Sequence, residues 1–431
     1  FCWMSCQGHR GYGLLWKCMY NVVNSFEIWC WQFLRRRVSD FRTATGRMRV
    51  SVYALSGVEA AMLFNNFIGS QFQVAALEVE PTSTVGELIA RLPGGGIHAS
   101  KRRRLLYGQS ELTGASTLTE IGVADGSSLT LVVTAPPHAL TCGWDGTARL
   151  WSCESGECLR TFEGHKGAVS SVALSPDGAS VLTASDDAAA KLWNIQSGEC
   201  TTTFEGHNGR VTSAVFSRDG SSVLTASDDC TARLWSVASG ECRRSFCGHQ
   251  DTVCSAALSP GGSLVLTASW DCSAKLWFAE TGCPKMTLEQ HEDPVTSAEF
   301  SSDGSCFVTA SWDSTANLWS TETGECRRTF EGHKNPVCSA ALSPDATSLL
   351  TASMDGTARL WSTLSGTCLK TLEGHEGRIL WVSFSPDGAW AVTASDDCTA
   401  KVWNIESEET LQTLKGHKQG LTKAVLGWIS Q

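Results

Sequence analysis

The sequence predicts an all-β repeat domain that follows a small α+β domain. Two features recur every 42 residues, a tryptophan and a histidine preceded by glycine, and a period of this length is typical of a repeat architecture. The tryptophans are Trp151, Trp193, Trp235, Trp277, Trp319, Trp361 and Trp403. The histidines are His165, His207, His249, His333, His375 and His417, with His291 after Gln290 as a variant. Ahead of the repeats, residues 48–134 alternate between strand-like and helix-like patterns.

Each repeat reads as four short strands. In the unit that includes FEGHNGRVTSAVFSRDGSSVLTASDDCTARLWS (204–236), we expect strands at 210–217, 222–227, 231–237 and 242–248. Four strands in about 40 residues, with Gly-His and Trp signatures, resemble the WD40 repeat, which forms the blades of a β-propeller. The resemblance covers residues 138–431.

The number of strands indicates how the ring closes. Six full units begin near residues 168, 210, 252, 294, 336 and 378. One strand remains at the C-terminus (420–427), and three remain at the front (138–142, 147–153 and 158–164). The resemblance therefore implies seven blades, the last shared by both ends of the domain, because this closure pairs strands that would otherwise be edges.

Residues 48–134 predict a β-β-α-β-β order. MRVSVYALSG (48–57) alternates like a strand, LEVEPTSTVGELIARL (77–92) reads as a strand and then a helix capped at Ser83 or Thr84, and 103–133 supplies two more strands. The segment resembles ubiquitin (the β-grasp fold), apart from an apparent insertion at 58–73. Its last strand, SLTLVV, continues into TAPPHAL without a free Gly-Gly tail, so the resemblance implies a built-in ubiquitin-like domain. The apolar patch that partners read in that family falls on Leu55, Leu106 and Val132, which also suit ordinary strand positions.

The remaining segments carry little pattern. Residues 1–47 are expected to be a poorly structured extension, with a membrane-surface helix as the alternative, and 135–137 a short linker containing Pro136-Pro137. The glycine-rich GGGIHASK (94–101) lacks the residues of a phosphate-binding loop.

Charge and cysteine content narrow the function classes. The net charge of the whole chain is -10, with +5 on residues 1–47 and -1 on residues 48–134. The repeats therefore carry -14, a charge that repels nucleic acid. No Cys-x-x-Cys pair suggests a zinc site. We expect no metal, no cofactor and no membrane insertion, a small-molecule ligand is disfavoured, and a reducing compartment, the cytoplasm or the nucleus, fits best.

The stretch 204–236 also contains the residue types of a hydrolase triad, in His207, Ser227 and Asp229. A triad needs one uniquely activated nucleophile, whereas near-identical copies of this set recur in six units. In the WD40 family, His, Ser/Thr, Asp and Trp form a structural network within a blade. The resemblance therefore assigns His207, Ser227, Asp229 and Trp235 to such a network, with a weaker copy in the seventh blade, where Gly143 replaces the serine.

Partner binding in the family centres on one face of the ring, which we call the top face. Three positions per blade line it: the third and fifth after the Gly-His histidine, and the one before the turn aspartate. These positions place Trp270, Trp312, Met354, Pro294 and Pro336 on three successive blades. The charged residues Asp186, Asp228, Asp396, Arg210 and Arg378 lie opposite, and Trp144 lies on the seventh blade. Exposed Trp beside apolar residues is typical of a protein interface, although repeat drift would also place Trp there.

The sequence thus favours a non-enzymatic scaffold that binds other proteins and docks a second partner through the ubiquitin-like domain. One alternative is a ribosome-assembly factor similar to Notchless, which joins the same two domain types. The other is a substrate receptor of a ubiquitin ligase. That interpretation lacks its Trp-Asp-x-Arg motif, because Ser, Asn or Phe follows the repeated Trp. The sequence leaves the oligomeric state open.

Overall fold

The computed structural model describes residues 48–55, 71–80, 82–85, 87–88, 102–107, 110–112, 116–124, 127–134, 137–407 and 409–430. The predicted extension at 1–47 lies outside these residues. The chain separates into two compact units, the first comprising Phe1–Gly95 and Arg103–Val133 and the second Gly96–Arg102 and Thr134–Gln431. Each unit is described by itself.

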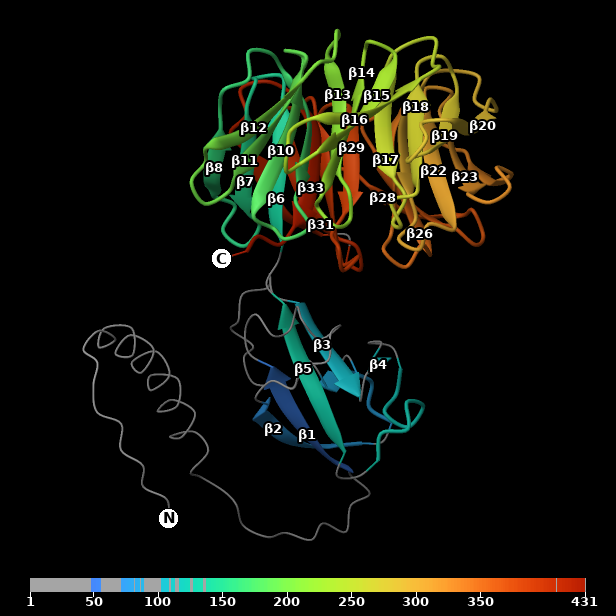
Figure 1. Cartoon of the computed structure of the whole chain (residues 1–431). Helices are drawn as coiled ribbons and strands as arrows, with labels where there is room; N and C mark the ends of the chain where they lie inside the picture. The colour runs from blue at the N-terminus through green and yellow to red at the C-terminus, as the bar shows by residue number, and fades with distance from the viewer. Residues whose placement is uncertain are drawn as a thin grey trace, which may run out of the picture. The chain divides into compact units, whose positions relative to one another are not determined.

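The first unit contains a five-stranded sheet (Figure 1). Its strands are β1 (Met48–Leu55), β2 (Gln71–Val79), β3 (Arg102–Tyr107), β4 (Ser110–Glu111) and β5 (Ser128–Thr134). The sheet order is β2-β1-β5-β3-β4, with β1 antiparallel to β2 and parallel to β5. Strand β2 begins six residues before the predicted 77, because its register pairs all eight residues of β1 across a bulge at Val52/Tyr53.

The predicted helix begins at Thr84, which forms a reciprocal cap. The Glu87 N–H donates to Thr84 Oγ1 at 3.3 Å, and the Thr84 N–H donates to Glu87 Oε2 at 3.2 Å. This cap turns Val85 and Leu88 into a buried cluster with Leu105, Leu118 and Leu129. The rest of the predicted helix, residues 89–92, lies outside the described residues.

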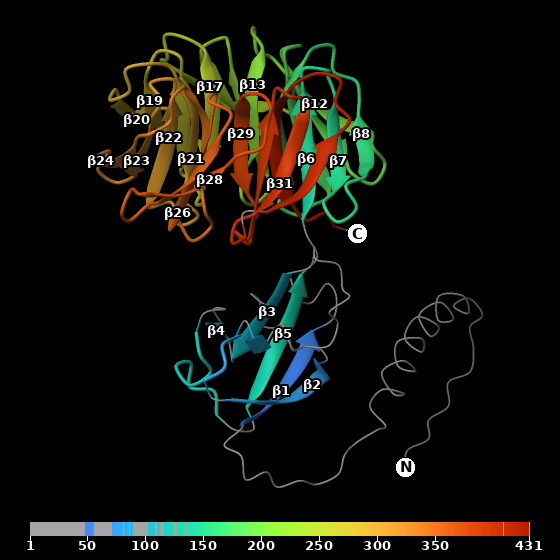
Figure 2. The ribbon, with the colours of Figure 1, turned by 180° about the vertical axis from the view of Figure 1, so that it is seen from behind.

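The second unit is a closed ring of seven four-stranded sheets (Figures 1 and 2). Blade 1 is β9 (Val169–Leu174), β10 (Ser180–Ser185), β11 (Ala189–Asn194) and β12 (Cys200–Glu205). Blade 2 is β13 (Val211–Phe216), β14 (Ser222–Ser227), β15 (Thr231–Ser236) and β16 (Cys242–Cys247). Blade 3 is β17 (Val253–Leu258), β18 (Leu264–Ser269), β19 (Ala274–Phe278) and β20 (Pro284–Leu288). Blade 4 is β21 (Val295–Phe300), β22 (Cys306–Ser311), β23 (Ala316–Ser320) and β24 (Cys326–Phe330).

Blades 5 and 6 repeat the same order. Blade 5 is β25 (Val337–Leu342), β26 (Ser348–Ser353), β27 (Ala358–Ser362) and β28 (Cys368–Leu372). Blade 6 is β29 (Ile379–Phe384), β30 (Trp390–Ser395), β31 (Thr399–Asn404) and β32 (Thr410–Lys415). We call the four strands of a blade a to d in this order. The a strands contact one another around the ring and form its inner wall.

Blade 7 confirms the predicted closure. It joins β33 (Leu421–Gly427) to β6 (His138–Gly143), β7 (Ala148–Ser152) and β8 (Cys158–Phe162). Strand β33 runs antiparallel to β6, with Leu421 opposite Gly143 and Gly427 opposite His138. In Figure 2 the green strand β6 stands among the red C-terminal strands. Two segments at opposite ends of the repeat domain thus share one sheet.

The core of the ring lies between blades. Seven buried clusters each take side chains from two neighbouring blades. Between blades 1 and 2, for example, Leu182 and Phe204 pack against Val223 and Trp235. No blade buries its own apolar faces, so the stability of each depends on its neighbours.

Candidate functional site

The repeated polar set forms one hydrogen-bonded chain in each blade. In blade 2, Trp235 Nε1 donates to Thr225 Oγ1 at 2.8 Å, and Thr225 Oγ1 lies 2.7 Å from His207 Nε2. The other imidazole nitrogen, His207 Nδ1, lies 2.8 Å from Asp229 Oδ2. Because the hydroxyl accepts from the indole, it can donate to His207 Nε2, and Nδ1–H then donates to the carboxylate.

All seven blades contain this chain. The threonines that join His to Trp are Thr141, Thr183, Thr225, Thr267, Thr309, Thr351 and Thr393. In blade 7, His417 reaches across from the C-terminal segment to Thr141 at 2.8 Å and to Asp145 at 2.9 Å. The seventh network is therefore complete, although its sequence lacks the serine.

The serine has a different role from the one expected. Ser227 Oγ accepts the backbone N–H of Asp229 at 3.1 Å, and the hydroxyl beside His207 belongs to Thr225, two residues earlier on β14. Both side chains are fully buried. A signal was available in the sequence, because Thr keeps this position in every unit, including LTCG at 140–143, where Ser is lost. This His-hydroxyl pair is a structural element and has no exposed nucleophile.

Both ionisable members of the blade 2 network have lowered pKa values, for different reasons. Burial lowers the pKa of His207, although Asp229 opposes the shift. Burial alone would raise the pKa of Asp229, but the hydrogen bonds from Thr231, His207 and the Asn208 N–H outweigh it. In Asp271, Asp313 and Asp355 the same balance lowers the pKa to about 2.

These shifts predict that the protein loses stability as pH falls, in two stages. A folded-state pKa below the unfolded value means that the unfolded chain binds more protons, so stability is present above the unfolded pKa and is lost below it. The histidines should act first, as pH falls below roughly 6.5, and the aspartates between roughly pH 4 and 2. Urea midpoints at about pH 8, 6, 5, 4 and 3 measure both stages, with return to pH 8 as the control for reversibility. A midpoint that stays constant from pH 7 to 5 would contradict the prediction.

The top face is built from the d-to-a loops and the b-to-c turns, which lie at the same end of the strands. Backbone bonds tie the two together beside each predicted anchor. Trp270 N–H donates to Thr252 O at 2.9 Å, Trp312 N–H to Pro294 O at 3.0 Å, and Met354 N–H to Pro336 O at 2.9 Å. The anchors therefore stand on fixed backbone.

Two of the predicted anchors lie against each other. The rings of Trp270 and Trp312 have centroids 5.7 Å apart and planes tilted by 45°. They keep 40% and 36% of their surface exposed, respectively, while Met354 on the next blade is half-buried. Trp144 is 44% exposed, but blade 6 separates it from Met354, so it does not join this group.

The predicted charged residues pair with one another across the rest of the face. Arg210 Nε binds Asp228 at 2.5 Å, and Arg210 NH1 lies 3.9 Å from Asp186 of blade 1. Arg378 Nε binds Asp396 of the same blade at 2.6 Å. Burial raises the pKa of Asp186, although Arg210 opposes the shift. The charged residues of blades 1, 2 and 6 on the top face are therefore largely paired within the protein.

Comparison with protein families agrees with the geometry. A family model described as the first β-propeller of IFT122 matches residues 210–425, and the model of the WD domain, G-beta repeat, matches residues 156–194. The chain belongs to the WD40-repeat β-propeller family. Proteins of this family are generally non-enzymatic interaction scaffolds.

One curated relative shares a short segment with this WD40 protein. It is described as a p21-activated protein kinase-interacting protein 1-like protein from Danio rerio, and the two are 37% identical over 59 residues. The match covers 14% of this chain and only 16% of the relative's length.

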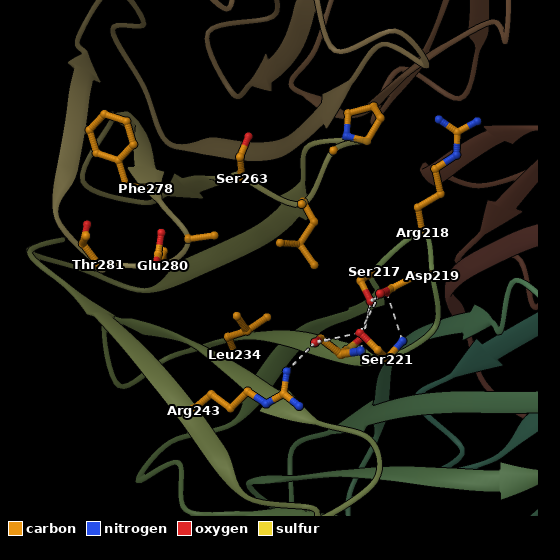
Figure 3. Close-up of a pocket in the computed structure, with 16 residues that line it drawn as sticks. Ser217, Arg218, Asp219, Ser221, Leu234, Arg243, Ser263, Phe278, Glu280 and Thr281 are labelled. Carbon is orange, nitrogen blue, oxygen red and sulfur yellow. Dashed lines mark hydrogen bonds between the residues drawn. The ribbon is translucent and has the colours of Figure 1, made fainter.

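The opposite face of the propeller has a hollow that the sequence did not point to (Figure 3). It lies between blades 2 and 3, with Leu234, Leu258 and Phe278 as its apolar lining, and the Arg218 and Arg243 side chains beside it. Phe278 is 45% exposed and stands where the other blades have Ser or Asn. Phe278 was thus visible in the sequence as a departure from the repeat, but that position was used only to show that the Trp-Asp-x-Arg motif is missing.

A second departure lies on the inner wall of the propeller. At one position of the a strand, blades 1 to 5 have serine (Ser171, Ser213, Ser255, Ser297 and Ser339). Blade 6 has Trp381 there, and blade 7 has Lys423. Lys423 Nζ lies 3.0 Å from Ser171 Oγ and 4.3 Å from the centre of the Trp381 ring. Burial lowers the pKa of Lys423 to about 8.

The described residues show neither a membrane-length apolar helix nor a group of three or more His, Cys, Asp or Glu side chains suited to a metal. The predicted ubiquitin-like patch falls on adjacent strands, with Leu55 on β1, Val132 on β5 and Leu106 on β3. Leu106 is half-buried. The pairing of β1 with β5 extends to Ala54 and Leu131, one residue short of Leu55 and Val132.

Proposed function

We propose that this protein is a non-enzymatic scaffold whose propeller binds a partner protein at Trp270, Trp312 and Met354. The observation that carries the proposal is the contact between two exposed tryptophans on neighbouring blades. Tryptophan dominates binding energy at many interfaces because it buries a large, rigid surface. One backbone hydrogen bond holds the main chain of each residue in place, so little backbone entropy is lost on binding.

The class of partner follows from charge and family. The net charge of -14 on the repeats supports a protein partner over nucleic acid. The curated relative is described as kinase-interacting, which makes a protein kinase one partner class to test. Among the described residues all fifteen cysteines are free thiols, which supports a cytoplasmic or nuclear location.

The first unit would dock a second partner as a ubiquitin-like module. The sheet order β2-β1-β5-β3-β4 and the capped turn at Thr84 support this assignment. The docking surface would be Leu55, Leu106 and Val132, on three adjacent strands.

The double change Trp270→Ala with Trp312→Ala should weaken partner binding by at least ~2 kcal/mol and leave the fold intact. A partner would first be recovered by pull-down and mass spectrometry, and then titrated against wild type and variant by calorimetry. Trp428→Ala is the matched control, because Trp428 is 41% exposed and lies beside Gly178, in an a-to-b turn of the opposite face.

Circular dichroism would verify that each variant is folded. Full affinity in the double variant would refute the top-face proposal and move the site elsewhere. A Leu106→Asp variant would then test whether the partner reads the first unit.

A further inference from the structure

The two blades that carry a top-face tryptophan pair also carry an aspartate beside it. Asp251 stands two residues after His249 in the loop next to Trp270, and Asp293 stands two residues after His291 in the loop next to Trp312. The same position in the other blades is occupied by Gly167, Gly209, Asn335, Gly377 and Gln419. Tryptophan and aspartate thus occur together in two neighbouring blades, whereas Gln419 accompanies Trp144 in blade 7.

The glycines occur in blades 1, 2 and 6, the three blades with Asp186, Asp228 or Asp396 in the turn. A Cβ on Gly377 would overlap Asp396 Oδ1, and one on Gly167 or Gly209 would press on the turn aspartate of its own blade. Where the turn residue is Trp270 or Trp312, a side chain fits. The loop is then held by Ser269 Oγ, which donates to Asp251 O at 3.1 Å, and by Ser311 Oγ, which donates to Asp293 O at 2.9 Å.

Both carboxylates are exposed and lack a cationic partner. In the described part of the chain, no Lys, Arg or His lies within ion-pair distance of Asp251 or Asp293. By contrast, Asp228 of blade 2 and Asp396 of blade 6 are paired with Arg210 and Arg378, respectively. The pKa of Cys272, in the same turn as Trp270, is raised by burial and then by four aspartates, Asp251 and Asp293 among them. The surface beside the tryptophan pair is therefore negative.

We propose that Trp270, Trp312, Asp251 and Asp293 form a site for a lysine or arginine side chain of the partner protein. A cation is attracted to an indole face within about 6 Å of its centre, and two rings tilted by 45° present two such faces to one ligand. The carboxylates of Asp251 and Asp293 add negative charge, which attracts the cation and which the indole rings lack. This inference rests on the proposed function and specifies which side chain the site recognises.

The test uses two short peptides on the full-length protein. Acetyl-Gly-Arg-Gly-amide is the probe, and the same peptide with citrulline is its neutral counterpart of equal shape. Indole N–H signals in ¹⁵N-labelled protein report binding, with Trp270→Phe and Trp312→Phe used for assignment. The arginine peptide should shift both signals saturably, and the citrulline peptide should bind at least about tenfold more weakly, because it has no charge.

Charge variants complete the test. Asp251→Asn with Asp293→Asn should reduce affinity for the arginine peptide at least about fivefold. The matched control, Glu199→Gln with Glu241→Gln, removes the same charge from exposed turns of the opposite face and should have no effect. Equal binding of the two peptides, or of the two double variants, would overturn the inference. If the tryptophan double variant loses the partner protein while these charge effects are absent, the proposed function stands and only the cationic ligand is wrong.

Discussion

Deletion of residues 416–431 should abolish the cooperative fold of the propeller. The deletion removes β33 and with it the pairing of six residues to β6. Leu421, Ala424 and Leu426 leave the cluster between blades 6 and 7, and His417 leaves the seventh polar network. Two buried leucines alone are worth roughly 4–10 kcal/mol, which is comparable with the entire stability of a domain.

Thermal unfolding followed by circular dichroism would measure the effect. A synthetic peptide of residues 416–431 provides the complementary experiment, because it should restore part of the transition by supplying β33 in trans. A truncated protein that melts like the full chain would show that the ring does not depend on its shared blade.

Thr225→Val should destabilise the protein by roughly 2–4 kcal/mol, and Ser227→Ala by only about 1 kcal/mol. Valine has nearly the shape of threonine, so the packing stays, but Trp235 Nε1 and His207 Nε2 lose the hydroxyl that lies 2.8 and 2.7 Å from them. Ser227→Ala removes one bond, from the Asp229 N–H. Both residues are fully buried and lie on β14, so their burial does not differ.

Urea unfolding of the two variants and wild type would compare the free energies of unfolding. Thr351→Val in blade 5 serves as a repeat of the experiment, because Thr351 makes the same two contacts with His333 and Trp361. If Ser227→Ala costs as much as Thr225→Val, the serine has the larger role after all.

The top-face predictions depend differently on sequence and structure. The sequence placed Trp270 and Trp312 at equivalent positions of neighbouring blades, which is enough to bring them close once the blades form a ring. It could not show that Arg210 binds both Asp228 and Asp186, because that contact depends on side-chain direction across two blades. Much of the charge on this side of the top face is therefore paired within the protein.

What the sequence determined by itself is the repeat architecture. A period of 42 residues, four strands per period, and leftover strands at both ends of the repeats predicted seven blades and their closure once the resemblance to the WD40 repeat was added. This works because each strand alternates its side chains with a period of two, and each turn is marked by local residues.

Only the tertiary structure decided which hydroxyl completes the network. Thr225 and Ser227 lie two residues apart on one strand, so alternation places both on the same face and cannot separate them. The distance to His207 depends on how the preceding d-to-a loop folds back over β14, a contact between segments 18 residues apart. The resemblance therefore named His207, Asp229 and Trp235 correctly, and the packing of loop against strand put Thr225 in the place expected for Ser227.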